Sequence, residues 1–180
     1  MSGSGISHPC VVDTNVVLVA NGQQPAVAGL CVEACIRALL AVQAGRQRVV
    51  VDDADRILGE YRHKTKPWSR QPKTGDIFVK WVHDYQYDRS RCDRVTLHPK
   101  ANDPQDFEEF PADAALATFE RADRKFVAVA KAHAEQPPIL EAADTDFWNA
   151  RQALAECGVK VEFLCPNDIQ RLAARKQKKS

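Results

Sequence analysis

Short β-branched apolar runs alternate with longer segments of helical spacing, and this alternation restricts the fold more than any other feature of the chain. The runs that we expect to be strands are 10–12, 49–51, 95–97 at a sheet edge, 139–144 and 159–163. Strands that alternate with helices favour an α/β fold whose sheet is parallel, or mostly parallel, with helices on both faces.

Helices and loops are expected between these runs. The predicted helices cover about 25–45, 52–61, 77–82, 122–134 and 147–156, and a last one starts near 166 and frays into basic residues 175–179. The polar segments 62–73 and 99–111, which contain prolines, are expected to be loops.

The 180 residues, 44% of them hydrophobic, suffice for one domain with a buried core. We expect a flexible leader over 1–8, one domain over 9–168 that includes a loop and helix segment at about 62–111, and a basic helix end or tail over 169–180. The formal net charge of +1 does not by itself indicate a nucleic-acid partner. No apolar run reaches the roughly 18 residues of a membrane span, and the first residues lack the pattern of a secretion signal, so we expect a cytoplasmic protein.

Six cysteines are present, and none of them form a C-x-x-C pair. Cys31 and Cys35 are four residues apart on the predicted helix 25–45 and share its apolar stripe. We interpret them as small core residues in a reduced compartment. A zinc site is the alternative, but it lacks a second ligand pair at suitable spacing.

Carboxylates stand where the predicted strands end. Asp13 follows the first strand, Asp52 or Asp53 ends the second, and Asp144 ends the strand that begins at 139. Ligands of open α/β sheets bind at the carboxyl ends of the strands, so these are candidate ligand positions. Glu60 lies about two turns into the helix that follows the second strand.

Two further observations place charge on apolar helix faces. Phe126 and Val127 lie three and four residues after Asp123, and Glu60 lies three residues after Ile57. A carboxylate on an inward face is costly unless something pairs with it. Carboxylates that converge in one cleft repel one another, and Mg²⁺ or Mn²⁺, which prefer oxygen ligands, would remove that repulsion.

Each acidic residue alone has an ordinary structural interpretation. Asp13 and Asp123 could be caps of the elements that follow them. Glu60 could be a solvated helix residue, and Asp144 with Asp146 could be turn residues. All of them in this order, each tied to its own element, favour one shared site.

These residues resemble the motifs of the PIN-domain family. Residues 11–15 (VVDTN) resemble its opening strand and first aspartate, and residues 57–61 (ILGEY) resemble the helix with its second acidic residue. Residues 122–130 resemble the helix with the third, and residues 143–147 (ADTDF) are similar to its D-x-D-F motif. The resemblance spans about 10–165, nearly the whole chain.

The resemblance implies a compact three-layer α/β/α sandwich with a mostly parallel central sheet, and often a homodimer. It also implies an endonuclease that depends on Mg²⁺ or Mn²⁺ and acts mostly on RNA. Many short bacterial members are toxins that an antitoxin inhibits, and this chain has extra material at 62–111 compared with them. The expected catalytic and metal-binding residues are Asp13, Glu60, Asp123 and Asp144, with Asp146 as a further metal ligand and with Thr14 and Asn15 orienting ligands or waters.

The loop after Glu60 combines cations with an aromatic ring. Its cations could bind phosphates, and its tryptophan could stack on a base of single-stranded RNA. The structural alternative is a solvated loop without a binding role, whose tryptophan covers the core. The candidate RNA-binding residues are Arg62, Lys64, Lys66, Trp68 and Arg70.

Two other function classes stay open. The domain could bind nucleic acid or protein without cutting, or it could be a small-molecule phosphohydrolase. A phosphoaspartate enzyme normally shows a D-x-D turn after its first strand, whereas this chain has Asp13-Thr14-Asn15 there. No P-loop and no G-x-G-x-x-G sequence is present, so nucleotide hydrolysis and dinucleotide binding lack support.

Overall fold

The structure is a computed structural model that describes residues 7–178. Five strands form one parallel sheet in the order β3-β2-β1-β6-β7, which confirms the predicted α/β class. These strands are β1 His8–Val12, β2 Gln47–Asp52, β3 Cys92–Val95, β6 Ile139–Glu141 and β7 Val161–Phe163. A separate antiparallel hairpin pairs β4 Pro99–Lys100 with β5 Asp103–Phe107.

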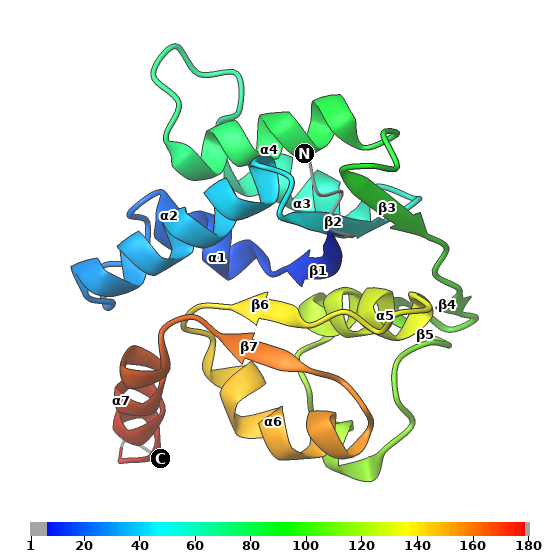
Figure 1. Cartoon of the computed structure of the whole chain (residues 1–180). Helices are drawn as coiled ribbons and strands as arrows, with labels where there is room; N and C mark the ends of the chain where they lie inside the picture. The colour runs from blue at the N-terminus through cyan, green and yellow to red at the C-terminus, as the bar shows by residue number, and fades with distance from the viewer. Residues whose placement is uncertain (1–6, 179–180) are drawn as a thin grey trace.

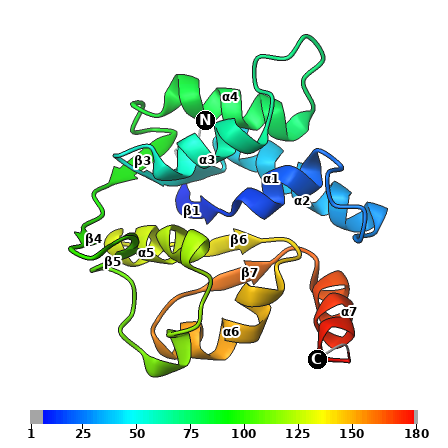
Figure 2. The ribbon, with the colours of Figure 1, turned by 180° about the vertical axis from the view of Figure 1, so that it is seen from behind.

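Helices cover the sheet on both sides, as expected for a three-layer α/β/α sandwich (Figures 1 and 2). Helices α1 to α4 pack against one another beside β1, β2 and β3, whereas α5 lies against β1, β2 and β6, and α6 packs on β7 and α7. Their bounds are α1 Thr14–Ala20, α2 Gly29–Gln43, α3 Arg56–Lys64, α4 Thr74–Tyr85, α5 Arg124–Ala132, α6 Thr145–Glu156 and α7 Pro166–Gln177.

The central strands explain where the core lies. Residues 10–12, 49–51 and 139–140 are all buried and almost all β-branched or leucine, as strands covered on both faces require. Tyr61 of α3 is also buried, and its hydroxyl donates to the backbone carbonyl of Val12. This contact fixes α3 against the end of β1, so residues on both elements face the same edge of the sheet.

Several predicted bounds are wrong. Helix 25–45 begins only at Gly29, because the backbone N–H of Ala28 is held outside the helix by the carboxylate of Asp168 at 3.2 Å. The strand that begins at Ile139 ends at Glu141, three residues before Asp144. The strand expected over 95–97 is β3, Cys92–Val95. The loop expected over 99–111 contains the hairpin of β4 and β5.

The segment 62–111 departs from the loop expected over its first part. Helix α3 continues to Lys64, so the loop covers only 65–73, and it projects from the body between α3 and α4 (Figures 1 and 2). The carboxylate of Asp76 accepts hydrogen bonds from the backbone N–H groups of Lys66 and Lys73, each at 2.9 Å. A Cβ at Gly75 would lie 2.4 Å from the carbonyl oxygen of Val17, so only glycine lets α4 approach α1 this closely.

Cys31 and Cys35 are buried core residues as predicted, but the prediction that both are reduced is wrong for Cys31, which forms a disulfide with Cys165. The two bonded cysteines are 134 residues apart, and they meet because the start of α7 lies against the first turn of α2. Spacing along the sequence could not show this pairing.

The chain ends also differ in part from the prediction. His8 already belongs to β1, and the rest of the expected leader, up to residue 6, lies outside the described residues. Helix α7 remains regular to Gln177, so residues 175–177 do not fray, and the last two residues of the tail lie outside the description. Over residues 7–178, no helix combines the length and the apolar character needed to cross a bilayer.

Candidate active site

Asp13 joins β1 to α1. It is 3% exposed, and its carboxylate caps α1 by accepting the backbone N–H of Asn15 at 3.1 Å. Burial raises the pKa of Asp13 and the nearby Glu60 adds to this, although hydrogen bonds from Glu141 and Asn15 oppose the shift. Asp13 therefore caps a helix, as its ordinary structural interpretation predicted, but it does so in a buried acidic environment.

Glu141 is a buried acid at the end of β6 that the sequence reasoning missed. Its Oε1 accepts the backbone N–H groups of Ala142 at 2.8 Å and Asp144 at 3.0 Å. Its Oε2 is buried and finds no donor. Burial, and then the neighbouring charge of Asp13, raise the pKa of Glu141 well above its usual range. A buried oxygen without a donor beside a second acid favours the protonated form of Glu141.

Glu60 on α3 has two ammonium partners and one hydroxyl partner. The hydroxyl of Thr14 donates to its Oε1 at 2.7 Å, Lys64 Nζ lies 3.0 Å from the same oxygen, and Lys125 Nζ lies 2.6 Å from Oε2. Burial alone would raise the pKa of Glu60, but Lys125 outweighs it and lowers that pKa. Glu60 is therefore ionised at neutral pH. It is not a solvated helix residue, which was the structural alternative predicted for it.

Asp123 and Asp144 are acids whose charge is poorly compensated. Asp123 stands at the N-cap position of α5, but its side chain makes no capping hydrogen bond. Burial, and then the charges of Asp13 and Asp144, raise the pKa of Asp123 to about 8. Burial, and then Asp13, raise the pKa of Asp144 to about 6, although its carboxylate caps α6 by accepting the backbone N–H of Asp146 at 2.7 Å. The charge of Asp13 thus acts on the pKa of both Asp123 and Asp144, so the three acids form one electrostatic group.

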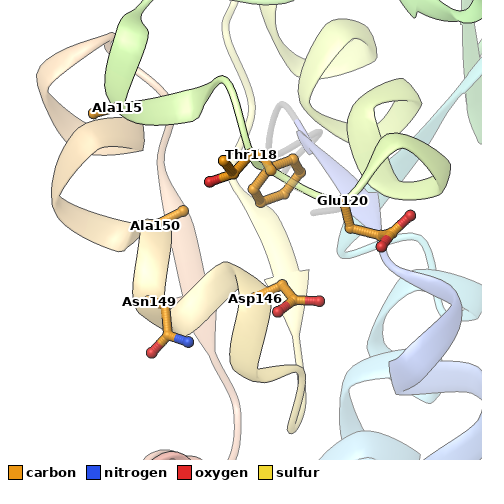
Figure 3. A pocket seen from close by; sticks show the side chains of 7 residues that line it. Ala115, Thr118, Glu120, Asp146, Asn149 and Ala150 are labelled. Atoms are coloured by element: carbon orange, nitrogen blue, oxygen red, sulfur yellow. The ribbon is translucent and has the colours of Figure 1, made fainter. Parts of the chain in front are cut away.

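Two hollows open beside these acids, and Asp146 lines both. One, of about 280 Å³, lies between α6 and the segment 115–120, with the side chains of Glu120 and Asp146 at its rim (Figure 3). The other, of about 380 Å³, lies between the start of α6 and α7. Asp144 and Asp146 line this second hollow from α6, and Arg175 and Lys176 line it from α7, where Lys176 Nζ also donates to the hydroxyl of Thr145.

The chemistry of these donors fits a hard divalent cation. The raised pKa values of Asp13, Asp123 and Asp144 show a surplus of buried negative charge, and Mg²⁺ and Mn²⁺ take carboxylate oxygens. Among residues 7–178, no three of these carboxylates bring their oxygens within 4.8 Å of one another. An ion held here would therefore need rotated side chains or bridging waters, and Mg²⁺ usually keeps several waters.

The predicted RNA-binding residues lie on α3 and the loop after it, not beside Asp144. The side chains of Lys64 and Lys66 line a hollow of about 410 Å³ next to the end of α1. Arg62 pairs with Asp55 at 3.1 Å. Trp68 is 59% exposed and meets His83 edge-on, with 5.4 Å between ring centroids, so it does not serve mainly to cover the core. Arg70 is exposed on the same loop.

Lys125 is a second site residue that sequence reasoning missed. Its signal was a lysine four residues before Val129 on the buried face of α5, just as the signal of Glu141 was an acid within an apolar strand. Asp52, considered at the end of the second strand, does not join the site. Its carboxylate instead accepts the backbone N–H groups of Ala54, Arg56 and Ile57 and fixes the start of α3.

Comparison of the chain with protein-family models, with curated proteins and with solved structures finds no match. The chemistry of the site and the resemblance of the motifs therefore carry the functional argument.

Proposed function

We propose that this chain is a PIN-like endoribonuclease that uses Mg²⁺ or Mn²⁺ to hydrolyse phosphodiester bonds of RNA. The observation that carries the proposal is the group formed by Asp13, Asp123 and Asp144. Asp13 is buried and Asp123 and Asp144 are half-buried, and the charge of Asp13 raises the pKa of the other two, so the three need a cation to be ionised together at neutral pH. A need for a cation to keep the carboxylates ionised is typical of a metal site and not of a set of helix caps.

The groove beside Asp144 supports a polyanionic substrate. Arg175 and Lys176 line the hollow of about 380 Å³ together with Asp144 and Asp146. Arg175 and Lys176 would hold the phosphates of a strand next to the carboxylates that would hold the metal. Such a metal would activate water and offset charge on the phosphate oxygens.

The chain's own residues have distinct roles in this scheme. Asp13, Asp123 and Asp144 would hold the principal metal, and Asp146, at the junction of the two hollows, would help to hold a second. Glu60, held by Lys125, keeps a fixed negative charge beside Asp13. The side-chain oxygen of Asn15 accepts the backbone N–H of Ala143 at 2.9 Å and so positions the loop that carries Asp144.

A second candidate, a PIN-like module that binds RNA or protein without cutting, is favoured by Lys125. Its ammonium, in contact with Glu60 at 2.6 Å, supplies part of the positive charge that a metal would bring. If this internal cation sufficed, the acidic residues would form a static network. We also propose, from the motif resemblance alone, a toxin restrained by an antitoxin, with a homodimer as the expected assembly.

The test is cleavage of a labelled single-stranded RNA, with DNA of the same sequence in parallel. The intact protein is compared with Asp13→Asn, Asp123→Asn and, as a matched control, Asp84→Asn on the exposed side of α4. We expect cutting that requires Mn²⁺ or Mg²⁺, stops with chelator, falls by at least about 100-fold in the two site variants and persists in the control. RNA binding without metal-dependent cutting would favour the binding module.

A further inference from the structure

Three cysteine sulfurs meet in the core, in a group that contains none of the acids named above. Cys31 and Cys35 lie one turn apart on α2, and Cys165 is the N-cap of α7. Their sulfurs all lie within 4.8 Å of one another, and the three residues are 2%, 0% and 4% exposed. Among residues 7–178, this is the one group of three or more His, Cys, Asp or Glu ligand atoms so close together.

The disulfide between Cys31 and Cys165 uses only two of these sulfurs. Cys35 is a free thiol, and burial raises its pKa to about 12, so it keeps its proton at neutral pH. Two other buried free cysteines, Cys10 and Cys92, stand outside the group. The convergence of a third sulfur therefore needs an explanation that the disulfide does not supply.

We propose that Cys31, Cys35 and Cys165 of the reduced chain form a site for one thiophilic d¹⁰ cation, Zn²⁺ or Cu⁺. Soft thiolate donors select such cations, whereas Mg²⁺ and Mn²⁺ prefer oxygen. The site is thus distinct in chemistry from the carboxylate site, and it does not rest on the proposed nuclease activity. The three sulfurs come from an i, i+4 pair on α2 and from the N-cap of α7, so the packing of these two helices sets their spacing.

The surroundings of the sulfurs compensate part of the charge. Three thiolates and one Zn²⁺ leave a net charge of −1 in the core, which is unfavourable unless something offsets it. Cys165 caps the N-terminus of α7, a helix of 12 residues, and the positive end of its dipole favours a thiolate there. Binding transfers no electrons, and each protonated thiol that becomes a ligand releases its proton to solvent.

The cation-bound and disulfide forms exclude each other. Oxidation of the two ligand thiolates by hydrogen peroxide joins the sulfurs of Cys31 and Cys165 and expels the cation; the two electrons break the O–O bond, and two protons from solvent complete two waters. In either form, α2 stays joined to α7, which carries Arg175 and Lys176 along the groove. The cysteine cluster thereby fixes the position of α7, and with it Arg175 and Lys176, without contacting the acids of the proposed metal site.

The test is a titration of the reduced, metal-free full chain with Cd²⁺ without oxygen, followed by the ultraviolet charge-transfer absorption of Cd²⁺–thiolate bonds. We expect saturation at one Cd²⁺ per chain, release of protons and a rise in Tm. Displacement of Cd²⁺ by Zn²⁺ or by Cu⁺ in separate arms identifies which cation binds more tightly. The site assignment fails if the reduced chain gives no thiolate absorption at one equivalent of Cd²⁺.

Variants separate the three-sulfur site from a two-sulfur site. Cys35→Ser should weaken Cd²⁺ binding by more than about tenfold and reduce the absorption, because one ligand is lost. Cys92→Ser, which removes a similarly buried thiol outside the group, should bind Cd²⁺ as the intact chain does. Oxidised Cys35→Ser retains the Cys31–Cys165 disulfide and serves as the folding control. Unchanged Cd²⁺ binding by a folded Cys35→Ser would overturn the proposal.

Discussion

Glu141 at the end of β6 and Asp13 after β1 are both buried, and the charge of Asp13 adds to the burial that raises the pKa of Glu141 at the base of the proposed metal site. The Oε1 atom of Glu141 accepts the backbone N–H groups of Ala142 and Asp144. A single side chain thus connects the end of β6, the loop that carries Asp144 and the first acid of the site.

Because burial and the charge of Asp13 favour a neutral Glu141, the neutral side chain of Glu141→Gln should preserve the site. The glutamine oxygen can accept the two N–H groups, and its NH₂ can donate to Asp13. We expect RNA cleavage within about threefold of the intact protein, whereas Glu141→Ala should lose on the order of 2 kcal/mol of unfolding free energy, since buried groups lose their partners. Urea unfolding and initial rates measure both. A loss of activity of about 100-fold in a stable Glu141→Gln would show that an ionised Glu141 is needed.

Asp123 predicts how stability without metal depends on pH. Its pKa is raised from 3.8 to about 8 in the folded chain, so the folded state binds more protons than the unfolded state between these values. The free energy of unfolding should therefore fall as pH rises from about 4 to about 8. With chelator present, Asp123→Asn should flatten this fall and be more stable at pH 8 by on the order of 2 kcal/mol.

The measurement is urea unfolding of both proteins across this range, with Asp84→Asn as the control. A slope of equal size in Asp123→Asn would contradict the burial of a repelled charge at this position.

Lys125 and Glu60 should be coupled in stability. Both side chains are mostly buried, at 11% and 16% exposure. Without Lys125, Glu60 keeps only the more exposed Lys64 as an ammonium partner, and without Glu60, Lys125 loses its carboxylate partner. We expect Lys125→Met and Glu60→Gln each to cost about 2–4 kcal/mol, and the double variant to cost less than their sum. A double-mutant cycle from urea unfolding measures this. Strict additivity would show that the ion pair does not persist in solution.

Arg175 should contribute to substrate binding rather than to the chemical step. Arg175→Glu reverses a charge in the hollow that Asp144 also lines, so it should weaken RNA binding by about tenfold, lower the salt dependence of binding and leave the maximal rate nearly unchanged. Lys160→Glu is the matched control, because Lys160 is exposed just before β7, at the opposite end of the sheet. Fluorescence anisotropy with chelator present gives the affinity. Equal losses in both variants would indicate only an effect of net charge.

The parallel sheet, which the structure confirms, and the four acids, which stay a prediction, both follow from local sequence patterns. Val11 and Val12 before Asp13 indicate a buried strand and the place where it ends. Phe126 and Val127 indicate the buried face of α5. Strand ends of a parallel sheet meet at one edge, so local signals were enough to propose a shared site.

Features that depend on distant partners could not be predicted in this way. Glu141 was included in a longer expected strand, and only the fold shows that this strand stops there with Asp13 beside it. Lys125 pairs with Glu60, which lies on another helix. Cys165 meets Cys31 across 134 residues, a pairing that spacing does not encode.

Binding of Mn²⁺ to the metal-free protein tests the central claim most directly, by electron paramagnetic resonance of free Mn²⁺ and by calorimetry. We predict one or two Mn²⁺ per chain, with release of protons near neutral pH because Asp123 and Asp144 must ionise, and a loss of affinity of at least about 100-fold in Asp123→Asn. Absence of binding by the intact protein, or equal binding by Asp123→Asn, would contradict the proposal that these acids form a metal site.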